Sequence, residues 1–294
     1  MHIKDILNQK KPAISFEFFP PKDETGSNAL VKTIEELRPL LPSYVSVTYG
    51  AGGGTRDLTH DLVTRIQTET KIPVVSHLTC VGSKQSEIFS ILERYKTHGI
   101  RNIMALRGDP PKGQTQFTKT EEGFGFAGEL VTFIKKNFPE MGIGVAGFPE
   151  GHPDTPNRIL EMEYLKRKID CGADYICTQL FFDNRDFYDF RERCELSGIK
   201  VPIIAGIMPI TSRKSINRMG ELALGARFPA KLLRSLSRAE TDEYAENVGI
   251  HWATEQVSDL IDTGVSGIHM YTLNKSKATV KIYQSIGVSS FVSI

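Results

Sequence analysis

One carboxylate lies in the middle of an aromatic segment near the start of the chain. Residues 15–21 read SFEFFPP, and their alternation predicts a β-strand that the two prolines end. Phe16 and Phe18 then point to one side of this strand, and Glu17 points to the other. Because a buried unpaired carboxylate is costly, we expect Glu17 to have either a partner or a catalytic role.

Two acids, Glu17 and Asp109, could carry proton chemistry. A carboxyl group walled by apolar side chains should have a raised pKa, which would keep Glu17 protonated and suit a general acid near neutral pH. Asp109 lies in an RGDPP turn and would place a negative charge beside the same site. The alternative for either acid is a buried ion pair with a basic residue such as Arg107.

Short β-rich apolar segments alternate with amphipathic segments along the chain. The predicted strands are residues 14–19, 44–50, 74–80, 102–108, 143–148, 175–182, 202–208 and 267–273. The predicted helices are residues 28–40, 56–70, 84–98, 127–138, 157–171, 185–197, 241–262 and 275–286, with extra helical segments at 212–225 and 229–237.

This alternation predicts an α/β fold in which helical crossovers join the strands of a parallel sheet. Eight strand–helix units within 294 residues favour a single (β/α)8 TIM barrel over an open sheet. The extra helices would lie between strands seven and eight. No linker or repeat divides the sequence, so residues 1–294 are expected to form one domain.

The carboxyl ends of the strands of a TIM barrel meet at one face, where the active site lies. Strand seven offers only Met208 and Pro209 there. The other strands are predicted to bring a set of polar or permissive residues to this face, namely Glu17, Thr48, Tyr49, His77, Arg107, Gly108, Asp109, Glu150, His152, Gln179, Asp183, Tyr271 and Asn274.

Some candidate residues also fit a purely structural role. His77 lies within a strand, where a histidine is as readily a core residue as a site residue. Arg167 and Lys168 end a predicted helix, and their spacing alone favours a solvated helix face.

Two GxGxxG segments, GFGFAG at 123–128 and GIGVAG at 142–147, do not fit a dinucleotide-binding turn. The first follows a polar loop instead of a strand, and the second lies on a strand and runs into Phe148. The glycines of GAGGGT at 50–55 lack the GK[ST] of a phosphate loop, but they would let a ligand approach the backbone closely.

Composition excludes several classes of protein. The net charge is +1 without a basic block, which argues against binding to nucleic acid or to an anionic membrane surface. We expect no signal peptide, no membrane helix and a cytoplasmic location. The four cysteines form no CxxC pair and no two histidines share metal-ligand spacing, so no metal is expected.

Eight motifs, in order, resemble those of the methylenetetrahydrofolate reductase family, specifically its short bacterial catalytic form. They span almost the whole chain and are SFEFFPP (15–21), YVSVTYGA (44–51), SHLTC (76–80), ALRGDPP (105–111), FPEGHP (148–153), LKRKIDCGAD (165–174), TQLFFD (178–183) and YTLNK (271–275).

The resemblance implies a (β/α)8 barrel that binds FAD without a Rossmann domain and reduces 5,10-methylenetetrahydrofolate to 5-methyltetrahydrofolate. It implies a ping-pong reaction in which NAD(P)H reduces the flavin and leaves before the folate takes its place. Glu17 would protonate the nitrogen that departs when the folate ring opens to an iminium. Family members form homo-oligomers, and some relatives receive electrons from a partner protein.

The resemblance also implies roles for single residues. Asp109 would lie beside the flavin and the pterin, and Gln179 would contact the folate and the nicotinamide. The implied FAD contacts are Thr48, Tyr49, Ala51, His77, Arg107, Gly108, Asp109, Ala127, Phe148, His152, Tyr164, Arg167 and Lys168.

The chain departs from the family pattern at four positions. Lys275 replaces an arginine expected near the substrate, which keeps the charge but loses the bidentate fork. Phe148 replaces a tyrosine near the flavin, and Glu161 and Tyr164 stand where aspartate and asparagine are common. We expect no regulatory domain after Ile294, and therefore no regulation by S-adenosylmethionine.

Two other functions fit the same barrel. One is a different flavin enzyme, related to proline dehydrogenase, and Glu17 together with Gln179 argues against it. The other is a barrel without catalysis that serves as an electron-relay or assembly subunit. The intact Glu17, Asp109 and Gln179 argue against lost catalysis, although they are compatible with a partner protein.

Overall fold

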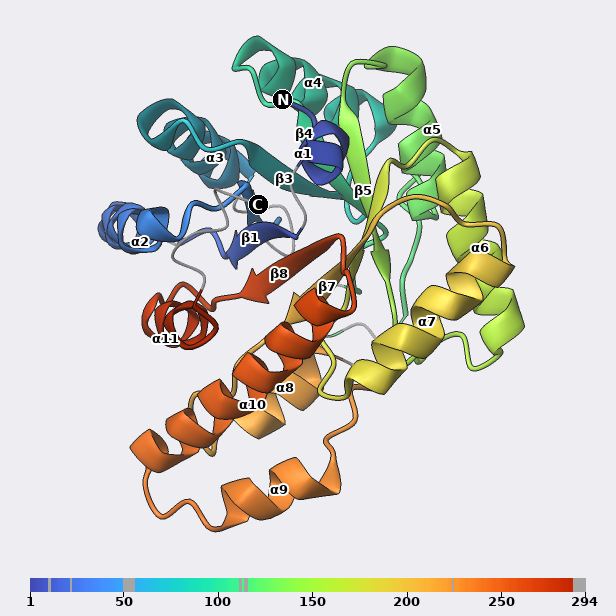
Figure 1. Ribbon diagram of the computed structural model, residues 1–294. Coiled ribbons are helices and arrows are strands. Elements are labelled where there is room, and N and C mark those ends of the chain that lie inside the picture. The colour runs from blue at the N-terminus through green and yellow to red at the C-terminus, as the bar shows by residue number, and fades with distance from the viewer. Residues whose placement is uncertain are drawn as a thin grey trace.

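The computed structural model describes residues 1–9, 12–21, 23–49, 56–110, 113, 116–223 and 225–287. Within these ranges, eight parallel strands close into a barrel in the order β1 to β8, and helices surround it (Figure 1). The predicted fold class, a (β/α)8 TIM barrel, is confirmed. The glycine segment at 50–55 and Ala51 lie outside the described residues.

The elements follow the predicted order. The strands are β1 Ala13–Phe18, β2 Tyr44–Val47, β3 Val74–Thr79, β4 Asn102–Leu106, β5 Gly142–Gly147, β6 Tyr175–Thr178, β7 Ile203–Ile207 and β8 Gly267–Tyr271. The helices are α1 Ile3–Gln9, α2 Glu24–Leu37, α3 Arg56–Thr70, α4 Gln85–Thr97, α5 Ala127–Asn137, α6 Arg158–Asp170, α7 Asn184–Leu196, α8 Ser215–Leu222, α9 Ala230–Ser237, α10 Asp242–Asp262 and α11 Lys277–Ser285, with a short 3₁₀ turn at Arg38–Leu40.

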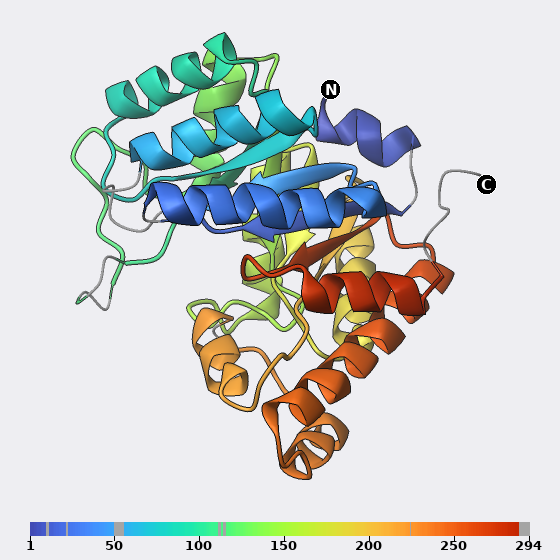
Figure 2. The ribbon, with the colours of Figure 1, turned by 90° about the vertical axis from the view of Figure 1, so that its left-hand side faces the viewer.

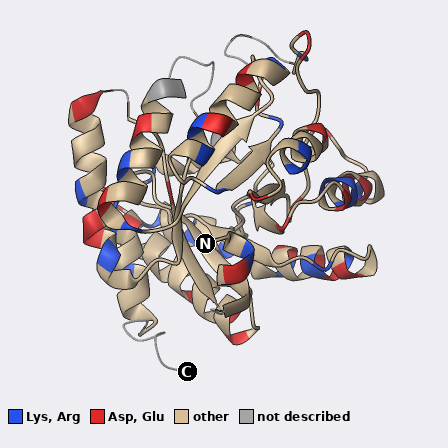
Figure 3. Cartoon of the chain, turned by 90° about the horizontal axis from the view of Figure 1, so that it is seen from above, with Lys and Arg blue, Asp and Glu red and all other residues tan. Residues whose placement is uncertain are grey.

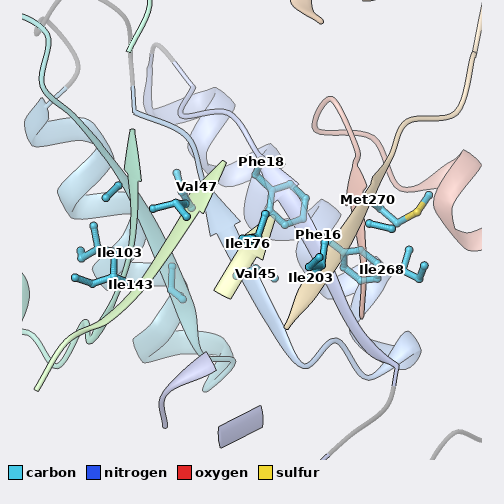
Figure 4. Packing of buried hydrophobic residues seen from close by; sticks show 14 of the residues in the cluster. Phe16, Phe18, Val45, Val47, Ile103, Ile143, Ile176, Ile203, Ile268 and Met270 are labelled. Atoms are coloured by element: carbon cyan, nitrogen blue, oxygen red, sulfur yellow. The ribbon is translucent and has the colours of Figure 1, made fainter. Parts of the chain in front are cut away.

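The outer surface of the barrel is the main hydrophobic core. Phe16 and Phe18 are fully buried there and lie beside Ile268 and Met270 of the neighbouring strand (Figure 4). The Phe16 ring also meets Tyr283 of α11 edge-on, with the ring centroids 6.0 Å apart. The period-2 alternation of β1 therefore places its phenylalanines toward the helices and Glu17 toward the barrel interior, as predicted.

Two glycines make room for tyrosine rings inside the barrel. A Cβ atom at Gly144 would lie 2.3 Å from the ring of Tyr175, and one at Gly206 would lie 2.8 Å from the ring of Tyr271. Real side chains do not approach so closely, so only glycine fits at both positions. The glycines of GIGVAG thus belong to β5 and serve packing, which confirms that this segment is no dinucleotide-binding turn.

The strand predicted at residues 175–182 is longer than the strand in the structure. β6 ends at Thr178, and the backbone N–H of Gln179 donates to the carbonyl of Gly147 at 2.8 Å. Phe181 and Phe182 are buried outside the barrel, against α7 and the α8–α10 helices. The apolar residues after Thr178 are therefore buried by the helices and do not extend the strand.

The helices between β7 and β8 form a group of their own at one side of the barrel (Figures 1 and 2). Met219, Leu232 and Leu236 from α8 and α9 pack with Leu180 and Phe182, which follow β6. This small cluster joins the added helices to the loops at the carboxyl end of the barrel.

The described surface carries charges of both signs on the surrounding helices (Figure 3). This mixture agrees with the net charge of +1. In the part of the chain that the structure describes, no helix has the length and apolar character needed to span a membrane.

The N-terminal helix α1 was missed by the sequence analysis. Ile3, Ile6 and Leu7 are buried and close the amino end of the barrel, where they pack with Tyr44 and Tyr175. Asn102 of β4 fixes the helix, because its side chain accepts from Ile3 N at 3.0 Å and donates to Met1 O at 3.1 Å. The spacing of its apolar residues is typical of a helix, but seven residues are too few to predict a helix from sequence alone.

Truncation of α1 tests its role as the floor of the barrel. Leu7→Ala should lower the free energy of unfolding by about 2–5 kcal/mol, since a fully buried leucine leaves a cavity. Leu196→Ala is the control, because Leu196 is 82% exposed and its loss should change stability by less than about 0.5 kcal/mol. Urea unfolding measures both, and equal stabilities of the two variants would contradict the role of α1.

Candidate active site

Glu17 lies near the carboxyl end of β1, inside the barrel, and is 7% exposed. Its Oε2 atom is 3.3 Å from His269 Nε2 of β8 and 3.4 Å from His77 Nε2 of β3. The contact with His269 is a hydrogen bond, whereas the geometry to His77 falls short of one. Glu17 is therefore paired, and its partners are two histidines from other strands.

The alternative of an ion pair between Glu17 and Arg107 is wrong. The Arg107 guanidinium, from the loop after β4, pairs with Asp154 at 3.1 Å and lies over the Phe117 ring. His77 is the only one of the two histidines that the sequence analysis named. His269 alternates with Gly267 and Tyr271 on β8, and this inward period was the signal available for it.

A chain of polar groups continues from Glu17 into the barrel. Ser15 Oγ lies 2.7 Å from His269 Nδ1 and also donates to the carbonyl of Ile268 at 3.3 Å. Because the Ser15 hydroxyl donates its hydrogen to the carbonyl of Ile268, its oxygen accepts from Nδ1–H of His269. The other ring nitrogen, Nε2, then faces Glu17. The Tyr44 and Tyr271 rings pack against the His269 imidazole, one stacked and one edge-on. These contacts fix the orientation of the imidazole.

The prediction of a raised pKa for Glu17 is wrong. Burial raises the pKa of this carboxyl group, but the His269 hydrogen bond and the nearby His77 and His269 together hold it below its ordinary value of 4.5. Burial also lowers the pKa of His77, which outweighs the opposing effect of Glu17. The apolar neighbours of Glu17 in the sequence point away from it, and its actual neighbours come from distant strands.

The loop after β4 forms one side of the barrel mouth. Gly108 has a φ of 87°, and a Cβ atom there would lie 2.7 Å from Val81, so the RGD turn requires glycine at this position. Asp109 follows on the exposed rim of the mouth, and Thr48 is held next to β1 by the hydrogen bond from its N–H to Phe18 O. Tyr49 is half-buried and packs against the main core.

The loop after β5 presents a neutral histidine. His152 Nδ1 accepts from the backbone N–H of Asp154 at 3.1 Å, which leaves the proton on Nε2. Burial lowers the pKa of His152, so the ring stays neutral near neutral pH. Phe148 packs edge-on against it, and Glu161 of α6 accepts from its backbone N–H at 3.0 Å.

Lys168 does not lie on a solvated helix face. Its Nζ reaches across from α6 and donates to the carbonyl of Ala146 in β5 at 2.7 Å. Burial lowers the pKa of this ammonium group to about 8, and no carboxylate lies within ion-pair distance among the described side chains. Arg167 is exposed and lies over the ring of Tyr164 at 5.9 Å. The nearby Glu161 opposes the effect of burial but forms no ion pair with Lys168 among the described side chains, and a partly buried cation of this kind fits an anionic ligand.

Gln179 begins the loop after β6. Its Oε1 accepts from the N–H of Leu180 at 2.9 Å, which leaves the side-chain NH2 group as a donor toward a ligand. Tyr271 supports this loop, because its hydroxyl donates to the carbonyl of Thr178 at 2.7 Å. The exposed Lys275 lines two neighbouring cavities of about 780 and 490 Å³.

Three other polar candidates are occupied by structural contacts. Asn274 clamps both backbone groups of Phe19, at 2.8 and 2.9 Å, and so joins the loop after β8 to β1. Glu150 accepts from Arg227, and Asp183 caps α7 and pairs with Arg185. Ala127 begins α5.

Comparison with known proteins identifies the family. The family model described as methylenetetrahydrofolate reductase matches residues 2–287. The chain belongs to the methylenetetrahydrofolate reductase family. The resemblance of its motifs is thereby confirmed.

Relatives of two lengths match the chain. It is 37% identical over 292 residues to the 5,10-methylenetetrahydrofolate reductase of Escherichia coli, covering 97% of this chain and 96% of that protein. It is 39% identical over 297 residues to methylenetetrahydrofolate reductase (NADH) 1 of Arabidopsis thaliana, covering 97% of this chain and 50% of that protein. The chain therefore spans about half the length of the plant relative.

A solved structure shares the fold. It is a Clostridium thermocellum protein that binds two copies of 5-methyl-5,6,7,8-tetrahydrofolic acid, with a TM-score of 0.67 and 18% sequence identity. The match covers 99% of both chains. At this identity the likeness supports the barrel fold alone.

A double-mutant cycle tests the pairing of Glu17 with His269. Glu17→Gln should lower the free energy of unfolding at pH 7 by about 1–3 kcal/mol, because a buried charged hydrogen bond is lost. In a His269→Asn background, Glu17→Gln should lower the free energy of unfolding much less. Glu17 is there already a buried carboxylate without its hydrogen-bonding imidazole. Urea unfolding of the four proteins measures the coupling, with the exposed Asp109→Asn as control. Equal costs in both backgrounds would contradict the pairing.

The same substitution has a predicted pH dependence. The folded-state pKa of Glu17 lies below its ordinary value of 4.5, so its contribution to stability is present above that pH and is lost as the pH falls. The cost of Glu17→Gln should therefore shrink between about pH 5 and about pH 3. A cost that grows over this range would show that the pKa of Glu17 is raised.

Proposed function

We propose that this protein is a flavoenzyme that reduces 5,10-methylenetetrahydrofolate to 5-methyltetrahydrofolate with electrons from NAD(P)H through FAD. Family membership and the names of the E. coli and Arabidopsis relatives support this reaction. The observation that carries the proposal is the Glu17 carboxyl group, held at the mouth of the barrel against His269. Ring opening of the folate needs a proton at such a position.

The acid in this proposal is the pair of Glu17 and His269. Because His269 keeps Glu17 ionised, the pair holds one proton on the 3.3 Å hydrogen bond between Nε2 and Oε2. Glu17 passes this proton to the departing folate nitrogen. Ser15 Oγ lies 2.7 Å from His269 Nδ1, so the imidazole keeps its orientation during this step.

The residues around the mouth fit FAD. The Lys168 ammonium, with Arg167 on the same helix, would bind the diphosphate, and the Nε2–H group of His152 would donate to the cofactor. FAD, when bound, supplies the hydride that reduces the folate. The proposed contacts are those implied by the family, namely Thr48, Tyr49, Ala51, His77, Arg107, Gly108, Asp109, Ala127, Phe148, His152, Tyr164, Arg167 and Lys168.

Three residues are proposed to bind the substrates. Asp109, exposed on the rim, would accept from the N–H groups of the pterin. The free NH2 group of Gln179 would donate to the folate and, before it, to the nicotinamide. A shared donor of this kind means that the two substrates bind in turn, as a ping-pong reaction requires. Lys275 would pair with the carboxylates of the folate tail.

Glu17→Gln separates the two halves of the reaction. Reduction of bound flavin by the nicotinamide should keep its rate to within about threefold, because no proton from Glu17 is needed. Reoxidation by 5,10-methylenetetrahydrofolate should slow by about 10²–10⁴-fold, the usual contribution of a general acid. Anaerobic stopped-flow absorbance measures both rates.

A matched substitution and a clear failure complete this test. Glu255→Gln removes an exposed carboxylate from α10 and should change neither rate. If Glu17→Gln slowed both half-reactions equally while FAD stayed bound, the assignment of Glu17 as the acid would be wrong.

The pKa of Lys168 predicts how FAD affinity depends on pH. Without ligand, this ammonium group has a pKa of about 8, and a bound diphosphate would raise it. FAD should therefore bind with proton uptake, and its affinity should fall about tenfold between pH 7 and pH 9. Fluorescence titration of the apoprotein measures the affinity.

Two variants make this prediction specific to Lys168. Lys168→Met should bind FAD weakly and without this pH dependence. Lys166→Met is the control, because Lys166 lies two residues earlier on α6 and pairs with Asp170. This variant should bind FAD as the unmodified protein does. An unchanged pH dependence in Lys168→Met would contradict the role of Lys168.

A further inference from the structure

The smaller of the two cavities beside Lys275 is rich in positive charge. Its volume is about 490 Å³, and the residues that line it are Phe19, Thr211, Ser212, Lys214, Ser215, Leu273, Asn274 and Lys275. This set contains two lysines and three hydroxyl side chains, and it contains no carboxylate. Neither lysine forms an ion pair among the described side chains. The cavity is therefore suited to a negatively charged part of a ligand.

The larger neighbouring cavity carries an excess of carboxylates. It measures about 780 Å³ and shares Lys275 with the smaller cavity. Three carboxylates at the start of α10 line it, those of Asp242, Glu243 and Glu246. Its second lysine, Lys277, is already paired with Glu246 at 2.6 Å. An anionic chain bound at Lys275 is therefore repelled by the larger cavity and attracted into the smaller one.

The turn that carries Lys214 is held in place by its neighbours. Ser212 and Ser215 each donate a backbone N–H to the hydroxyl of the other at 3.2 Å. The backbone N–H of Arg213 donates to Asp242 at 3.3 Å, which joins this turn to α10. Lys214 directly precedes α8, so its exposed side chain starts from a backbone that these hydrogen bonds fix.

Phe19 connects the smaller cavity with the acid of the active site. It follows Glu17 by two positions, so the alternation of β1 places it on the same side and about 7 Å farther along the chain. Asn274 holds both backbone groups of Phe19, at 2.8 and 2.9 Å, and the residue is 36% exposed. A fixed and exposed aromatic ring at this place is a surface on which another flat ring can stack.

The parts of the folate follow the same order as these residues. The nitrogen that Glu17 protonates is bonded to an aryl ring, and this ring carries a glutamate with two carboxylates. We propose that the smaller cavity binds this end of the folate, with Phe19 against the aryl ring and Lys214 joining Lys275 at the carboxylates. The inference rests on the proposed function and adds Phe19 and Lys214 to the residues that set the affinity for folate.

Two lysines fit a glutamate better than one. A lysine ammonium is a point charge without the planar fork of an arginine, so Lys275 alone does not hold both carboxylates in one orientation. Lys214 supplies a second charge from a different element of the fold, α8 instead of the loop after β8. The direction of the folate tail, toward α8 and away from α10, follows from this second contact.

Binding of a folate with charged or neutral carboxylates tests the role of Lys214. The probes are 5-methyltetrahydrofolate and its diamide, in which both carboxylates of the glutamate are neutral amides. Lys214→Met should raise the Kd of 5-methyltetrahydrofolate about threefold to tenfold, because a charged contact is lost. The Kd of the diamide should change by less than about twofold. Anaerobic titration calorimetry of the holoprotein measures both, with the flavin kept reduced so that no turnover occurs.

Phe19→Leu tests the contact with the aryl ring. Both probes carry this ring, so the substitution should raise the Kd of both about threefold, through the loss of ring stacking. Phe19 and Lys214 are thereby distinguished by the same two compounds. A Phe19→Leu variant that binds both probes as the unmodified protein does would overturn the assignment of Phe19.

Lys277→Met is the matched control, because Lys277 lines the larger cavity and is paired with Glu246. It should change the Kd of either probe by less than about twofold. If Lys277→Met weakened binding more than Lys214→Met, or if Lys214→Met weakened both probes equally, the proposal would be overturned. An unmodified protein that binds no 5-methyltetrahydrofolate would overturn the proposed function as well. Folate binding that Lys214→Met leaves unchanged would overturn this inference alone.

Discussion

The hydrogen bond between Glu17 and His269 joins the first strand of the barrel to the last. A carboxylate inside a barrel loses its hydration, and its charge persists only if other groups replace the lost water. Here the imidazole of His269 provides that replacement, and the parallel register of β1 and β8 sets the distance. The site therefore depends on closure of the barrel, since the two residues are 252 positions apart in sequence.

The surrounding structure serves the same pair. Glycines at 144 and 206 allow tyrosine rings to fill the barrel interior, and α1 seals the end opposite the mouth. Ser15 fixes one nitrogen of His269, so the other nitrogen faces Glu17. The mouth stays polar while the floor is enclosed, which confines proton chemistry to the end where the loops converge.

The sequence predicted the barrel because its strands are short, apolar and regularly spaced. The alternation in SFEFFPP also gave the inward direction of Glu17 correctly. The pKa of Glu17 could not be predicted, because the histidines that lower it come from β3 and β8 and are distant in sequence. The same limit applies to Lys168, whose burial depends on how α6 packs on β5.

Other differences have local causes. Helix α1 is only seven residues long, and its stability comes from burial against the barrel floor instead of from its own propensity. The apolar run after Thr178 resembles a strand because Phe181 and Phe182 are buried by the added helices. In both cases tertiary contacts decided the structure.

The most direct test of the proposed function follows the folate half-reaction alone. The flavin of the purified holoprotein is photoreduced without oxygen, 5,10-methylenetetrahydrofolate is added, and the absorbance of oxidised flavin is recorded. The oxidised band should return at a catalytic rate. A band that stays bleached would contradict the proposed function, and would show that the pair of Glu17 and His269 serves another substrate.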